Sequence, residues 1–287
     1  MDDLWRIDEV PVAAARGGAL DERKQQQEKE EPRDEFHPKI EAIPWNVRGS
    51  GGRKHRKKLT THHDIAQIGF GGCGGMYNYF LGVASILQVE EYDLENVIFS
   101  GVSAGCFPAT ILALGINAKE FFFKENIPLI EHAAACSYAG LGKWIPLVKK
   151  NMLAMLPEDA YKKGDQKLYF SVTEVPALKN HVITTWESNE DMVDCMLSSG
   201  HVPLYTDSLV SSYRGKKFVD GGLTNNHPIV HPTAPHAMLQ IWKWRWISPT
   251  WILVTTNADW ATEMFRMGRE DATKHLHEIE RAFFPTA

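Results

Sequence analysis

The 287-residue chain has an ordinary globular composition, with 44% hydrophobic and 23% charged residues, which excludes a collagen, a disulfide scaffold and a wholly disordered chain. Its net charge of -5 disfavours nucleic acid as a partner. The four cysteines lack Cys-x-x-Cys spacing, so neither a metal site nor a disulfide framework is predicted. The start, MDDLWRIDEV, lacks a signal-peptide pattern, and no apolar run reaches the ~18 residues of a membrane span. We therefore expect an intracellular protein, cytoplasmic or peripheral to membranes.

Residues 1–60 differ from the rest of the chain. Residues 21–35 (DERKQQQEKEEPRDE) are mostly charged and contain no apolar side chain, so they cannot bury enough surface to offset the entropy of ordering. We predict a disordered tail or solvated helix, dispensable for folding. The basic run at residues 53–58 is interpreted as a solvated linker, with nuclear targeting or anionic-lipid contact as alternatives. The ordered domain is predicted to span residues 61–287.

Two strand–turn–helix units open this domain. Ile65–Phe70 is an apolar run that stops at glycines, which predicts a buried strand, and Met76–Val89 has apolar residues at helical spacing. Asn96–Ser100 predicts a second buried strand, and Ser103–Leu114 a second helix. Repetition of this unit is typical of an α/β fold with a parallel sheet.

The later elements are predicted from the same periodicities. Residues 119–163 are mostly helical by pattern. After them we predict two paired strands, a short helix, a strand ending at two glycines, a last strand and a terminal helix. These lie at Lys167–Val175, His181–Trp186, Met192–Ser199, Lys217–Asp220, Trp251–Thr255 and Thr262–Phe284.

A Gly-x-Ser-x-Gly motif, Gly101 to Gly105, lies between the second predicted strand and its helix. A sharp strand-to-helix turn raises the Ser103 hydroxyl out of the backbone, and the flanking Gly101 and Gly105 avoid clashes in that strained turn. The helix that follows directs its N–H groups and positive dipole end toward the serine. The motif therefore predicts a nucleophile at Ser103.

A glycine-rich turn, residues 71–75, follows the first strand. Glycines expose backbone N–H groups, which suit either a phosphate or an oxyanion. A nucleotide is disfavoured because no acidic residue ends the second strand and no Walker lysine is present. Because a nucleophile turn follows on the next strand, we predict that Gly72, Gly74 and Gly75 form an oxyanion hole. The alternative is a purely structural tight turn.

The third motif is Asp220-Gly221-Gly222, at the end of a predicted strand. An aspartate in this position presents its carboxylate over the edge of a sheet. An Asp-Gly turn in an ordinary loop is the alternative.

Together the three motifs, in this order, resemble the patatin-like phospholipase family, with its animal-type branch closest. The strings GGCGGMYNYFLGVASIL, SSGHVPLY, KKFVDGGLTNNHPI and MGREDA agree, and the resemblance covers about residues 64–282. It implies a three-layer α/β/α fold with a mostly parallel central sheet. It also implies hydrolysis of phospholipid or acylglycerol esters by a dyad of Ser103 as nucleophile and Asp220 as base, without cofactor or metal. Two positions depart from the family pattern. Tyr77 replaces the last glycine of a Gly-x-Gly-x-x-Gly frame that starts at Gly72, and it is expected to narrow the cleft. His227 replaces an aliphatic residue.

Two other functions remain open. An α/β-hydrolase would use a triad of Ser103, Asp207 and either His231 or His236, but that fold places several strands before its nucleophile turn, and here only one precedes it. A non-catalytic lipid-binding member of the same family is the second alternative. It is disfavoured because both Ser103 and Asp220 are present.

A lipid substrate implies contact with a membrane or lipid-droplet surface. Tryptophans alternate with cations near the C-terminus, a composition that favours a lipid interface. A strand with one tryptophan face packed in the core explains the pattern equally well. The residues are Trp242, Lys243, Trp244, Arg245, Trp246 and Trp251.

Overall fold

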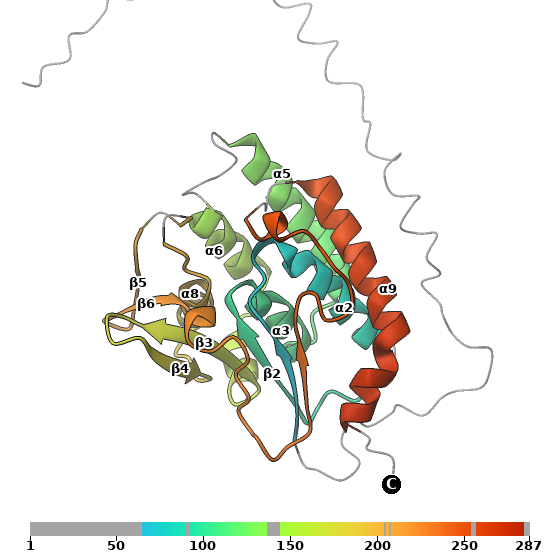
Figure 1. Ribbon diagram of the computed structural model, residues 1–287. Coiled ribbons are helices and arrows are strands. Elements are labelled where there is room, and N and C mark those ends of the chain that lie inside the picture. The colour runs from blue at the N-terminus through green and yellow to red at the C-terminus, as the bar shows by residue number, and fades with distance from the viewer. Residues whose placement is uncertain are drawn as a thin grey trace, which may run out of the picture. The chain divides into compact units, whose positions relative to one another are not determined.

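The computed structural model describes residues 65–89, 92–136, 144–203, 205–206, 208–253 and 257–283 (Figure 1). The predicted tail, residues 1–60, lies outside the described residues, so its disorder stays a prediction. Within the described residues, no helix has both the length and the apolar character needed to cross a membrane.

A central sheet flanked by helices organises the described part of the chain (Figure 1). Four strands run parallel in the order β7-β1-β2-β3, and β4, β5 and β6 add antiparallel pairings beside β3. Strands β1 and β2 are buried along their whole length, as parallel strands covered on both faces are. The predicted α/β fold is thus confirmed. The strands are β1 (Ala66–Phe70), β2 (Val97–Val102), β3 (Leu168–Glu174), β4 (Lys179–Ile183), β5 (Ser211–Tyr213), β6 (Lys216–Asp220) and β7 (His236–Leu239).

The helices match the predicted helical regions to within a few residues. A π-helical segment, Phe122–Asn126, joins α4 to α5, and short 3-10 turns lie at Gly74–Met76, Ser103–Gly105, Gly221–Leu223 and Pro249–Ile252. The helices are α2 (Tyr77–Val89), α3 (Cys106–Ala113), α4 (Ala118–Phe121), α5 (Ile127–Ala135), α6 (Trp144–Met155), α7 (Ala160–Gly164), α8 (Asn189–Ser199) and α9 (Ala258–Phe283).

The pairing along β3 brings Ser103 and Asp220 together. The first part of β3 pairs with β2, with Ser171 opposite Val102, and its last part pairs with β6, with Val172 opposite Asp220. Because β4 takes the other edge of β3, β2 and β6 lie one after the other along the same edge. Ser103 follows directly after β2, so the register places it beside the end of β6, where Asp220 lies.

Helices α2 and α9 pack side by side (Figure 1), and glycines let their backbones approach. A Cβ on Gly82 would lie 2.1 Å from the Phe265 carbonyl oxygen, and one on Gly268 would lie 1.9 Å from the Tyr79 carbonyl oxygen. The buried Arg269 donates a 2.7 Å hydrogen bond to Ser85 across the same contact. We call this contact the α2–α9 seam.

The prediction of a strand at Trp251–Thr255 is wrong for residues 251–253, which the structure describes. Pro249–Ile252 forms a 3-10 turn, and residues 254–256 lie outside the described residues. The edge of β1 that a last strand would need is occupied by β7, which the sequence analysis missed. Ile252 instead packs on the glycine loop, with its carbonyl oxygen 2.1 Å from where a Gly74 Cβ would lie.

The tryptophan-rich segment is not a core strand. Trp242 and Trp246 are 43% and 74% exposed, and their rings stack with centroids 6.1 Å apart. Arg245 is bound by Asp271 and Glu270, which ties this segment to α9. The core-strand interpretation is therefore wrong, and contact with a lipid interface stays a prediction.

Candidate functional site

Ser103 sits in a strained turn between β2 and α3. Its φ of +54° lies in the left-handed region, which non-glycine residues adopt only when the surroundings impose it. The turn is tight: a Cβ on Gly101 would lie 2.5 Å from the Cys106 Cα, and one on Gly105 would lie 2.4 Å from the Phe70 carbonyl oxygen. Both glycines are thus required by close backbone contact, as the motif predicted.

Hydrogen bonds to the end of α8 hold this turn in place. The Ser103 N–H donates a 2.8 Å hydrogen bond to the Ser199 hydroxyl, which in turn donates to the Ser171 carbonyl oxygen at 2.6 Å. Ser199 is fully buried. The backbone of the turn is therefore fixed to both α8 and β3.

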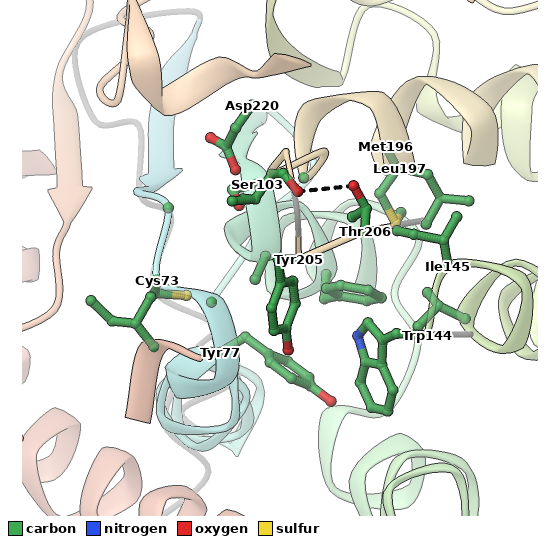
Figure 2. Close-up of a pocket in the computed structure, with 18 of the residues that line it drawn as sticks. Cys73, Tyr77, Ser103, Trp144, Ile145, Met196, Leu197, Tyr205, Thr206 and Asp220 are labelled. Atoms are coloured by element: carbon green, nitrogen blue, oxygen red, sulfur yellow. Dashed lines mark hydrogen bonds between the residues drawn. The ribbon is translucent and has the colours of Figure 1, made fainter. Parts of the chain in front are cut away.

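Asp220 directs its carboxylate toward Ser103 (Figure 2). Burial raises the pKa of Asp220, while the neighbouring Ser103 hydroxyl, a hydrogen bond from the Gly222 N–H and the nearby His201 oppose that rise. The Gly222 N–H lies 2.7 Å from Oδ1, and the Asp220 N–H donates to the His201 carbonyl oxygen at 2.8 Å. The carboxylate is thus held in place and made more basic than an exposed aspartate.

The glycine loop lies against Ser103. A Cβ on Gly72 would meet the Ser103 Cβ at 3.2 Å, and Gly74 has a φ of +51°. The Gly72 N–H, however, donates a 2.8 Å hydrogen bond to Oδ1 of Asn226. One of the three predicted oxyanion donors is therefore engaged by a side chain, and Gly74 and Gly75 remain the predicted donors.

A cavity of about 310 Å³ opens beside these groups (Figure 2). Ser103 and Asp220 lie at one end of the view, and Tyr77 and Trp144 lie at the other. Most of the lining is apolar and comes from α3, α5, α6 and α8, which suits a hydrocarbon chain. The main apolar residues are Phe107, Leu129, Trp144, Ile145, Val148, Met196 and Leu197.

Tyr77 forms part of this lining and is only 4% exposed. Its hydroxyl donates to Oδ1 of Asn126 at 2.5 Å, Asn126 donates to Asn78 at 2.7 Å, and its ring packs on Phe107 with centroids 5.2 Å apart. The side chain is thus fixed on several sides. It lines the cavity, and the narrowing of the cleft that the sequence suggested stays a prediction.

The histidines named by the triad hypothesis do not reach the cavity. Among the described residues, His231 and His236 are absent from its lining, and His236 is exposed with Nδ1 3.1 Å from the Ala234 carbonyl oxygen. Asp207 lies outside the described residues. The described residues also contain no cluster of three or more potential metal ligands.

The sequence analysis missed five polar residues that line the cavity. They are Asn126, Asn151, Tyr205, Thr206 and Asn226. Tyr205 is the last residue of the SSGHVPLY segment, Thr206 comes directly after it, and Asn226 follows the Asp-Gly-Gly motif. For these three residues, proximity to a recognised motif was the available signal.

Comparison with known proteins identifies the family of this chain. The family model for the patatin-like phospholipase matches residues 70–232, more than half of the chain. The chain belongs to the patatin-like phospholipase family. The resemblance that the three motifs carried is thereby confirmed.

Three curated relatives show the range of this family. Patatin-like phospholipase domain-containing protein 4 of Homo sapiens is 30% identical over 168 residues, covering 57% of this chain and 66% of that protein. Omega-hydroxyceramide transacylase of Mus musculus is 28% identical over 171 residues, covering 56% and 28%. Patatin-like phospholipase domain-containing protein 2 of Homo sapiens is 29% identical over 170 residues, covering 56% and 33%. The matches span less than two thirds of each relative's length.

Proposed function

We propose that this patatin-like protein is a lipid acyl hydrolase that cleaves carboxylic esters of phospholipids or acylglycerols with Ser103 and Asp220. The observation that carries the proposal is the Asp220 carboxylate, which is directed toward Ser103 beside an apolar cavity (Figure 2). The family match supports the same chemistry.

The proposed reaction has two steps. Asp220 accepts the proton of Ser103 as Oγ attacks the ester carbonyl carbon, and N–H groups of the glycine loop stabilise the oxyanion. Collapse of the tetrahedral intermediate breaks the ester bond, and the alcohol leaves with the proton from Asp220. A water molecule, deprotonated by Asp220, then attacks the acyl-serine, and the fatty acid leaves as Ser103 regains a proton.

Ester hydrolysis by the purified protein, with site variants, tests this function. Wild type should hydrolyse a medium-chain p-nitrophenyl ester and react once with a fluorophosphonate, while Ser103→Ala and Asp220→Asn should each lose at least about 10³-fold in kcat. His236→Ala, in an exposed histidine, is the control and should retain wild-type kcat. A histidine as essential as Ser103 would favour the triad, whereas lipid binding without Ser103-dependent turnover would favour the non-catalytic alternative.

We also propose that the substrate is taken from a lipid surface. Two cavity-lining residues are exposed apolar side chains, Val202 at 36% and Leu253 at 61%, and Trp246 is more exposed still. Exposed apolar side chains at a cavity suit insertion into an interface. Leu253→Ser should lower turnover of vesicle-bound ester more than that of a monomeric ester. Equal loss on both substrates, or no vesicle co-sedimentation of wild type, would contradict this.

A further inference from the structure

Asn226 joins the two loops of the site. Its Oδ1 accepts the 2.8 Å hydrogen bond from the Gly72 N–H, and it lines the cavity. A Cβ on Gly72 would lie 2.9 Å from this oxygen, and one on Gly222 would lie 3.2 Å from it and 3.0 Å from Oδ1 of Asp220. The amide of Asn226 therefore occupies a space that exists because the residues on either side of it in space, Gly72 and Gly222, have no Cβ.

This space separates the glycine loop from the aspartate. On one side Oδ1 of the amide accepts from the Gly72 N–H, and on the other it lies against Gly222 of the Asp-Gly-Gly loop. An acceptor is needed here, because a part-buried N–H left without a partner costs about 1–3 kcal/mol. A charged acceptor would bring a second carboxylate to the loop that carries Asp220, so a neutral amide is the side chain that meets both conditions.

We propose that Asn226 is a positioning residue that holds the Gly72 peptide against the Asp-Gly-Gly loop, so that the amides after Gly72 point at the oxyanion. The inference rests on the proposed hydrolase function. Asn226 thus gives the amides of the glycine loop two roles. The Gly72 amide anchors the loop, and the amides of the residues that follow stabilise the oxyanion. Sequence analysis assigned all of these glycines the same role.

A competing geometry makes the opposite prediction. If the oxygen of Asn226 occupied the place of the substrate oxyanion, it would compete with substrate for the Gly72 N–H. Removing the side chain would then raise kcat/KM. The two interpretations are therefore separated by the sign of one measurement.

Asn226→Ala tests the positioning role. A loop displaced by about 1 Å can cost about 100-fold in rate, so kcat should fall by roughly 10- to 100-fold while KM changes less than about three-fold. A trifluoromethyl ketone, which forms an oxyanion with serine, should lose affinity in proportion to kcat. A plain alkyl methyl ketone of equal chain length should not, since it depends little on the oxyanion site.

The neighbouring residue provides a matched control. Asn225 accepts from the His227 N–H at 3.1 Å and donates to Asn180 at 3.4 Å, and it is not among the residues that line the cavity. Asn225→Ala should therefore keep the wild-type kcat and ketone affinities. Thermal unfolding of every variant shows which of them fold.

Asn226→Asp keeps the acceptor and adds a charge. Its carboxylate would lie against Gly222, in the loop that carries Asp220, and Asp220 is also near His201, Cys73 and Cys106. It should retain more kcat than Asn226→Ala at high pH, with the acidic limb of its pH profile moved upward. This variant also tests the role if the alanine variant fails to fold.

The outcomes separate the two proposals. Wild-type turnover that persists in Ser103→Ala, or no turnover at all, overturns the hydrolase function and the positioning role with it. Turnover that depends on Ser103 but is unchanged or raised in Asn226→Ala overturns the positioning role alone. Equal loss of affinity for both ketones would also overturn it, because it indicates a general distortion of the cavity.

Discussion

The α2–α9 seam and the two glycines around Asn226, Gly72 and Gly222, both need a missing Cβ, for different physical reasons. In the seam, a Cβ on Gly82 or Gly268 would meet backbone carbonyl atoms of the facing helix at about 2 Å. At the site, a Cβ on Gly72 or Gly222 would meet the end of the Asn226 side chain at 2.9–3.2 Å. Backbone atoms of packed helices cannot give way, whereas a side-chain amide can rotate. Changes in the seam should therefore alter stability, and changes at Gly72 or Gly222 should alter function.

The largest effect on stability is expected from Gly268→Ala. Alanine is about 1 kcal/mol better than glycine within a helix, but overpacking typically costs about 1–3 kcal/mol, and a 1.9 Å approach to a backbone oxygen is at the severe end. We expect a net loss of at least about 2 kcal/mol in urea unfolding, with normal kcat per fluorophosphonate-titrated site. Unchanged stability would show that the helices separate easily.

Gly72→Ala should show the reverse pattern, with a large loss of kcat and little loss of stability. Its Cβ displaces the Asn226 oxygen and approaches Ser103, so kcat should fall by about 100-fold. The unfolding free energy should change by no more than about 1 kcal/mol, because the contacted atoms belong to side chains. A stability loss equal to that of Gly268→Ala would remove the distinction between the two regions.

Two tyrosines of α2 sharpen the same comparison. Tyr77 lines the cavity, whereas the Tyr79 hydroxyl donates to Asp271 of α9 at 3.0 Å. Tyr77→Leu should enlarge the cavity and favour longer esters, with kcat/KM rising about four-fold for each additional methylene buried. Tyr79→Leu should lower the free energy of unfolding about as much as Tyr77→Leu does. It should leave the dependence of kcat/KM on ester chain length unchanged. The measurement is kcat/KM over p-nitrophenyl esters of increasing length.

The raised pKa of Asp220 predicts opposite effects on stability and activity. Folding favours its protonated form, so its contribution to stability is present below the unfolded pKa of about 3.9 and is lost as pH rises through the folded value. At pH 7, Asp220→Asn should therefore be inactive yet at least as stable as wild type. Its advantage in melting temperature should shrink toward pH 4. A large stability loss at pH 7 would mean that the carboxylate stabilises the fold.

The smallest effect is expected away from both regions. The Ser188 hydroxyl caps α8 by accepting from the Asp191 N–H at 3.1 Å. Ser188→Ala should cost about 1 kcal/mol in unfolding free energy and leave kcat unchanged. A change in kcat would mean that the start of α8 is coupled to Ser199 at its other end.

Most of the fold was predictable because its signals are local. The runs that form β1 and β2 are apolar and stop at turns, and α9 shows clear helical periodicity. The strand prediction at Trp251–Thr255 failed because two segments could pair with β1. Trp251–Thr255 is rich in strand-forming residues, but the edge of β1 was filled by His236–Leu239. A short run with weak pattern became a strand because a sheet edge was open to it.

The sequence by itself determined which residues are proposed to carry the chemistry, since Gly-x-Ser-x-Gly after a strand and Asp-Gly-Gly after another are patterns of adjacent residues. Only the tertiary structure decided how they meet. The register of β3 sets Ser103 beside Asp220, and the Gly72 amide is engaged by Asn226, which lies 154 residues away in sequence. A motif fixes what a side chain can do, but contacts between distant segments depend on packing of the whole chain, and packing leaves no periodic signal in the sequence.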